Sequence, residues 1–195
     1  MTKENLSELL RLKSGTPDWE TQKARMYIHL PWIGPLAYLH TIFEPADKTQ
    51  LERASREMGI PSFWQGFLAA QNGANLYLHS LYILGVFEPK RLQSRRPEDV
   101  VAFDIEKTNK ESKLAAADDW LQIGIYGHDA SRVLLSRTNQ SVQATDRAGK
   151  RILAEWRDVG FWLREEIFRL SLLFSPEGRL LCDERLTLPS TSHSY

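Results

Sequence analysis

The chain has 195 residues, of which 42% are hydrophobic and 26% are charged, as expected for a globular protein of one domain with an appendage. The 25 lysines and arginines balance 25 aspartates and glutamates, so the net charge indicates neither a nucleic-acid-binding protein nor a polyanion mimic, and leaves local charged patches open. The single cysteine, Cys182, excludes an internal disulfide and a thiolate-rich zinc site, and it fits a reducing cytoplasm.

Residues 1–44 are expected to form an N-terminal arm that packs on the main domain. The leucines of residues 6–12 predict a short amphipathic helix. The apolar stretch Met26–Phe43 has about the minimum length for a membrane span, but two prolines within it would break a straight helix. We therefore expect an extended piece followed by a short helix that lies across the core. Trp19 and Trp32 are either packed under this arm, which we favour, or exposed anchors for a partner.

Residues 45–174 carry the regular patterns of the main domain. Leu51, Ala54 and Met58 have helical spacing, and Gly59 is suited to end that helix in the left-handed conformation. Pro61 can open a second helix, since its fixed φ suits the first turn. The apolar stripe of this helix is formed by Phe63, Trp64, Phe67 and Leu68. The helix is expected to end at Asn72 and Gly73, which both tolerate left-handed geometry.

The second half of this domain predicts strands and a closing helix. Alternating or short apolar runs separated by turns indicate the strands, and Glu88–Asp119 is expected to be a long charged loop. Asp158 is a suitable N-cap for a helix that runs to Phe174. Residues 175–195 are expected to be a partly mobile extension, with a mobile tail from Thr187. The expected strands are Leu81–Val86, a short one near Val100–Phe103, Trp120–Tyr126, Arg132–Ser136, Ser141–Thr145 and Arg151–Trp156.

No motif for phosphate binding, dinucleotide binding, zinc-dependent proteolysis or serine hydrolysis occurs in the sequence, and the five histidines lack ligand spacing. We therefore expect no metal and no cofactor. His128-Asp129 allows an acid–base pair of a hydrolase, although an aspartate in a hairpin turn is the commoner meaning. Asp118-Asp119 could bind a hard cation and Lys90–Arg96 could contact phosphate, but solvated surface positions are favoured for both.

The order of these elements resembles the SUKH superfamily, which comprises fungal cell-wall regulators of the Smi/Knr type and bacterial relatives. The shared pattern is a helix closed by glycine, a proline that opens an aromatic-Phe-Leu helix, Asn-Gly, and a buried strand that ends in glycine. Two departures are a shorter spacing between the glycine and the proline and an N-terminal arm without a counterpart. The matching positions, all structural in kind, are Gly59, Pro61, Trp64, Phe67, Leu68, Asn72, Gly73, Gly85 and Trp162.

The elements and the resemblance together predict an α+β fold. We expect a mainly antiparallel, SUKH-like sheet of about five or six strands flanked by helices, with an N-terminal helical arm.

The resemblance implies a non-enzymatic, cytoplasmic protein-binding domain. Bacterial members are often immunity proteins that neutralise a polymorphic toxin, often a nuclease, by tight binding; the alternative is an intracellular regulatory or scaffolding domain. We expect a monomer or weak dimer that binds neither membrane nor nucleic acid. The carboxylates of the charged loop are expected to face the partner, and these are Glu98, Asp99, Asp104, Glu106, Asp118 and Asp119.

Overall fold

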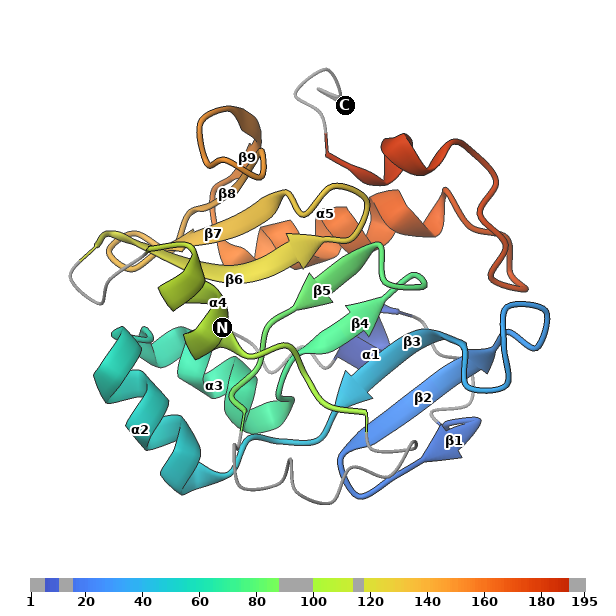
Figure 1. Ribbon diagram of the computed structural model, residues 1–195, viewed down its shortest axis with the longest axis horizontal. Coiled ribbons are helices and arrows are strands. Elements are labelled where there is room, and N and C mark those ends of the chain that lie inside the picture. The colour runs from blue at the N-terminus through green and yellow to red at the C-terminus, as the bar shows by residue number, and fades with distance from the viewer. Residues whose placement is uncertain (1–5, 11–15, 88–99, 114–117, 190–195) are drawn as a thin grey trace.

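The computed structural model describes residues 6–10, 16–87, 100–113 and 118–189, and its centre is one antiparallel sheet (Figure 1). The nine strands follow one another in chain order, so each strand pairs with its neighbours along the chain, and β1 and β9 form the two edges. Their bounds are Trp19–Glu20 (β1), Ala24–His29 (β2), Tyr38–Phe43 (β3), Ala74–Leu76 (β4), Leu81–Ile83 (β5), Trp120–Tyr126 (β6), Arg132–Ser136 (β7), Val142–Thr145 (β8) and Ile152–Trp156 (β9).

The predicted α+β class with an antiparallel sheet is confirmed, but the prediction of five or six strands is wrong. Three of the additional strands lie in residues 19–43. For Met26–Phe43 we expected an extended piece followed by a short helix, but this stretch forms most of β2 and all of β3. Pro31 and Pro35 both lie in the loop between β2 and β3, so they interrupt neither strand. None of the helices in the described part of the chain has the length and apolarity needed to cross a membrane.

Helix α2 (Lys48–Met58) contains the predicted apolar positions and has the predicted end. It begins at Asp47, whose carboxylate accepts hydrogen bonds from two backbone N–H groups of the first turn, and ends at Gly59, which has a left-handed φ of 62°. Helix α3 (Ser62–Ala70) follows directly after Pro61. A short helix, α1 (Leu6–Leu9), forms in the N-terminal segment where the leucines predicted one.

The strand predicted near Val100–Phe103 is not formed, and helix α4 (Ile105–Glu111) follows instead. Asp104 starts this helix by accepting a hydrogen bond from the backbone N–H of Glu106. Lys110 pairs with Glu106 one turn earlier, and such i,i+4 pairs support a short helix whose sequence is too polar to show an apolar period. A hydrophobic pattern therefore does not indicate this helix.

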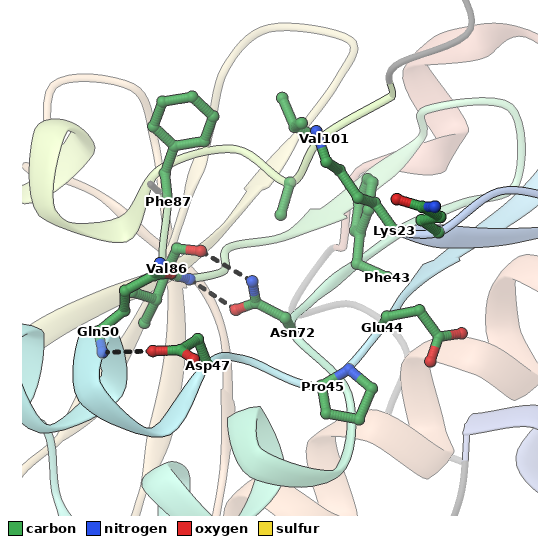
Figure 2. A pocket seen from close by; sticks show the side chains of 12 residues that line it. Lys23, Phe43, Glu44, Pro45, Asp47, Gln50, Asn72, Val86, Phe87 and Val101 are labelled. Carbon is green, nitrogen blue, oxygen red and sulfur yellow. Dashed lines mark hydrogen bonds between the residues drawn. The ribbon is translucent and has the colours of Figure 1, made fainter. Parts of the chain in front are cut away.

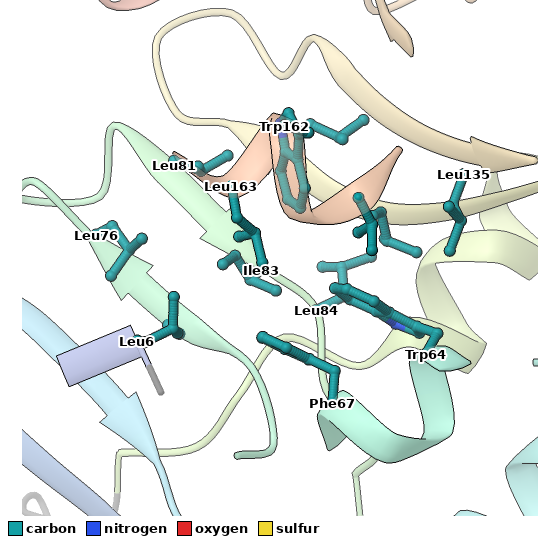
Figure 3. Close-up of a cluster of buried hydrophobic side chains, with 14 of the residues drawn as sticks. Leu6, Trp64, Phe67, Leu76, Leu81, Ile83, Leu84, Leu135, Trp162 and Leu163 are labelled. Atoms are coloured by element: carbon teal, nitrogen blue, oxygen red, sulfur yellow. The ribbon is translucent and has the colours of Figure 1, made fainter. Parts of the chain in front are cut away.

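The main hydrophobic core lies on the face of the sheet that α2, α3 and α5 (Val159–Ser171) cover (Figures 1 and 3). The side chains of Trp64, Phe67 and Leu68 are at most 4% exposed, which confirms their predicted burial. The rings of Trp64 and Phe67 stack with their centroids 4.4 Å apart. A smaller cluster, formed by Ala24, Met26, Phe43 and Ala102, lies apart from this core.

The predicted Asn72-Gly73 pair, before β4, lies directly against Gly85, after β5. The Asn72 side chain donates to the Val86 carbonyl and accepts from the Val86 N–H, both at 2.7 Å, in the manner of a paired strand. A Cβ at Gly73 would lie 2.4 Å from the Ile83 carbonyl oxygen, and one at Gly85 would lie 2.2 Å from the Asn72 carbonyl oxygen. These close backbone approaches explain why small residues occupy the motif.

Helix α5 begins as predicted, since the Asp158 carboxylate accepts from the Phe161 N–H at 2.7 Å. The helix ends at Ser171, three residues before the predicted end. A 3-10 helix, η2 (Glu184–Thr187), follows in the C-terminal segment. The Thr187 side chain is buried there, and residues 190–195 of the predicted mobile tail lie outside the described chain.

Burial of His40 predicts that the protein loses stability in mild acid. Its ring is 3% exposed, its Nδ1 accepts a hydrogen bond from the Tyr77 N–H, and burial lowers its pKa from 6.5 to about 3. Between these two values the unfolded chain binds a proton that the folded protein does not, so stability falls as the pH falls below about 6.5. We expect His40 to account for a loss of about 2 kcal/mol between pH 7 and pH 5.

Urea unfolding at several pH values measures this effect. Substitution His40→Gln should flatten the pH dependence, whereas substitution of the exposed His29 by glutamine should leave it unchanged. An equal slope for the wild type and His40→Gln would show that other groups cause the acid sensitivity.

Candidate binding surfaces

Among the predicted partner-binding carboxylates, Asp104 and Glu106 belong to the contacts of α4. Asp104 is the N-cap of α4, and its pKa is raised mainly because the carboxyl group is partly buried. Glu106 receives hydrogen bonds from Lys110 and from Arg53 of α2, and the bond from Lys110 is the main reason that its pKa is lowered. Glu106 therefore ties α4 to α2, and Asp104 holds the start of α4. Glu98 and Asp99 lie outside the described residues.

Asp118 and Asp119 are exposed just before β6, and Asp119 Oδ1 accepts a hydrogen bond from the Thr138 hydroxyl at 3.1 Å. The chain around them is held by Arg137, whose guanidinium donates to the backbone carbonyls of Asp118 and Trp120. The same side chain donates to the carbonyl of Met58 at 3.0 Å, at the end of α2. Sequence reasoning missed Arg137, because its carbonyl partners come from segments about 20 and 80 residues away and leave no local pattern.

The residues His128 and Asp129 do not form an acid–base pair with each other. Asp129 Oδ1 accepts from the Ser131 N–H at 2.8 Å, as is typical of a hairpin turn, and His128 Nδ1 lies 3.8 Å from a Glu184 oxygen. Among the described residues, no group of three or more His, Cys, Asp or Glu side chains could hold a metal ion.

A cavity of about 280 Å³ opens between the end of β3, the start of α2 and the segment before α4 (Figure 2). Its polar wall is already engaged: Asn72 is bonded to Val86, and Asp47 caps α2. Glu44 is paired with Arg25 at 2.8 Å. The cavity therefore presents mainly satisfied groups and apolar side chains, among them Phe43, Phe87 and Val101.

Large exposed apolar side chains gather on α5 and the segment after it. Four of the nine in the described chain lie here, and we call them the α5 surface: Phe168, Leu172, Leu181 and Leu186. Phe168 and Leu172 are one helical turn apart and are each 58% exposed. The Leu181 N–H donates to the carbonyl of Leu173 at 2.8 Å, so the C-terminal segment runs beside the end of the helix.

A buried ion pair fixes this segment to α5. Glu166 and Arg169 form two hydrogen bonds, at 2.9 and 2.8 Å, and the Glu166 side chain is only 2% exposed. The Tyr126 hydroxyl donates to Glu166 at 2.8 Å; burial, followed by the neighbouring carboxylate, raises its pKa well above 10. Arg169 also donates to the carbonyls of Leu186 and Thr187. Strand β6, helix α5 and the C-terminal segment thus meet at one charged centre.

Three more of the exposed apolar side chains lie in the loop between β2 and β3, and we call them the hairpin tip: Trp32, Ile33 and Leu36. Trp32 is 43% exposed and the guanidinium of Arg179 lies 4.8 Å above its ring. Trp19 is partly covered and lies against Tyr38. The two tryptophans therefore divide between the two roles considered from the sequence, since Trp19 packs and Trp32 is exposed.

No protein-family model and no curated protein matches the chain.

Proposed function

We propose that the chain is a non-enzymatic, SUKH-like protein-binding domain that acts in the cytoplasm as an immunity protein and neutralises a toxin by direct contact. The observation that carries the proposal is the α5 surface. Apolar side chains that gather on one exposed region are typical of protein-binding sites, because they release water when a partner covers them.

The rigid support of this surface also favours binding. The buried pair of Glu166 and Arg169 holds the C-terminal segment before a partner arrives, so little conformational entropy is lost on association. The two negative charges of Asp118 and Asp119 face solvent, and their field can attract a basic partner over a distance. In this proposal the α5 surface determines how long the complex lasts, and the two carboxylates determine how fast it forms.

Co-expression tests the proposed function. The product of the gene immediately upstream should arrest growth when expressed alone, and this chain should restore growth and bind that product in vitro. If the chain binds no product of a neighbouring gene, the immunity function is wrong and a regulatory or scaffolding role takes its place.

Substitution Leu172→Asp should shorten the lifetime of the complex. A carboxylate at the centre of an apolar contact must lose its water without gaining a partner, so we expect the dissociation rate to rise about tenfold or more. Ile152→Asp is the matched control, because Ile152 is similarly exposed at 47% but lies on β9. Equal dissociation rates for the two variants, measured by surface plasmon resonance, would show that the α5 surface is not part of the interface.

The double substitution Asp118→Lys and Asp119→Lys should slow association and leave the dissociation rate nearly unchanged. Charges near an interface act mainly on the encounter of the partners, and the effect weakens as salt is added. Thermal stability should change by only about 0.5 kcal/mol, as for other surface substitutions. An association rate that stays the same at low salt would show that these carboxylates do not steer the partner.

A further inference from the structure

The turn after α5 places two opposite charges beside the hairpin tip. Phe174 and Leu180 form an antiparallel bridge, and the turn between them carries Glu177 and Arg179, both exposed. Within the described chain, no opposite charge lies within ion-pairing distance of either side chain. Glu177 and Arg179 are only two residues apart, so each molecule presents a cation and an anion at the same place.

The turn packs tightly against the hairpin and is held by its own backbone hydrogen bonds. Gly178 has a φ of 81°, and a Cβ there would lie 2.6 Å from Leu30 Cδ2, so the turn is pressed against the base of the hairpin. The Ser175 N–H donates to the Arg179 carbonyl, and the Gly178 N–H donates to the Ser175 carbonyl, both at 2.8 Å. The positions of the two charges are therefore set by the backbone.

We infer that the hairpin tip is a contact between two copies of this chain, related by a twofold axis. In such a contact Glu177 of each copy faces Arg179 of the other, and Ile33 and Leu36 of the two tips cover each other. A twofold contact requires a surface that is complementary to itself, and one residue of each sign side by side meets that requirement. A negatively charged membrane would attract Arg179 but repel Glu177, so the pair of charges favours a second copy.

The contact is small, so we expect a weak dimer. Three exposed apolar side chains and one turn form much less surface than the roughly 1,600 Å² that stable complexes bury. The inference does not depend on the proposed function, because the α5 surface uses other residues. Self-association can therefore fail while toxin binding succeeds, and the reverse also holds.

Sedimentation equilibrium of the purified chain over a wide range of concentrations tests this inference through charge reversal. Glu177→Arg and Arg179→Glu should each be monomeric, because the twofold axis turns each change into two contacts between like charges. An equimolar mixture of these two variants should form a heterodimer, since opposite charges then face each other again. Arg157→Glu is the matched control: Arg157 lies 4.7 Å from the ring of Phe161, at the other end of α5, and its reversal should leave the dimer intact.

Ile33→Asp should also give a monomer, while Ile152→Asp should not. A wild-type chain that stays monomeric at the highest concentration would overturn the inference, as would a dimer that both charge reversals leave unchanged. Binding of the monomeric chain to phosphatidylserine vesicles, with loss of this binding in Ile33→Asp, would assign the tip to a membrane and would equally overturn it.

Discussion

Replacing Arg169 by methionine should lower the free energy of unfolding by about 3–5 kcal/mol, one of the two largest effects we expect from a single substitution. The change removes both hydrogen bonds to Glu166 and leaves a carboxylate that is only 2% exposed without its cation. Losing one partner of a buried pair costs more than the pair itself contributes, because the remaining charge keeps its desolvation cost. The carbonyls of Leu186 and Thr187 lose their donor as well.

Urea unfolding of a double-mutant cycle separates these contributions. The variant Glu166→Leu with Arg169→Met contains no buried charge at this centre, so it should be more stable than Arg169→Met alone. Arg157→Met serves as the control, since the Arg157 side chain is 74% exposed and its loss should change stability by about 0.5 kcal/mol or less. If Arg169→Met and Arg157→Met unfold at the same urea concentration, Glu166 and Arg169 do not hold the C-terminal segment.

Phe67→Ala should cost a similar amount, about 3–5 kcal/mol, because it leaves a cavity in the main core. The ring of Phe67 stacks on that of Trp64, and both side chains are almost completely buried between α3 and the sheet (Figure 3). Surrounding side chains in a close-packed interior can fill such a cavity only in part.

Phe168→Ala is the matched comparison for this substitution. It removes the same atoms from a side chain that is 58% exposed, so thermal unfolding should shift little. An unchanged unfolding midpoint in Phe67→Ala would mean that α3 does not pack against the core as described.

Patterns of hydrophobic residues were sufficient for elements that have one buried and one exposed face. The strands β6 to β9 and the start of α5 at Asp158 were predicted close to their observed positions. The hairpin of β2 and β3 is hard to predict, because the two prolines of its loop resemble breaks within one apolar segment. Helix α4 was missed because its stabilising contacts are between charges, which a hydrophobic pattern does not record.

The binding surfaces were harder to predict, for a different physical reason. Sequence reasoning selected the carboxylates by their charge, but Asp104 and Glu106 are occupied by contacts that only the folded chain brings together. The α5 surface did leave a signal: Phe168 and Leu172 fall outside the apolar stripe that faces the core. Apolar residues on the outer side of an amphipathic helix would have indicated this surface before the structure did.

Hydrogen–deuterium exchange tests the central claim, that a protein partner covers the α5 surface, most directly. The chain is measured alone and in complex with the product of the upstream gene. Slower exchange in the complex is expected in the second half of α5 and in residues 181–188, because bound protein excludes water from them. Protection confined to residues 104–119, with exchange in α5 unchanged, would contradict the account and place the partner at the charged segment instead.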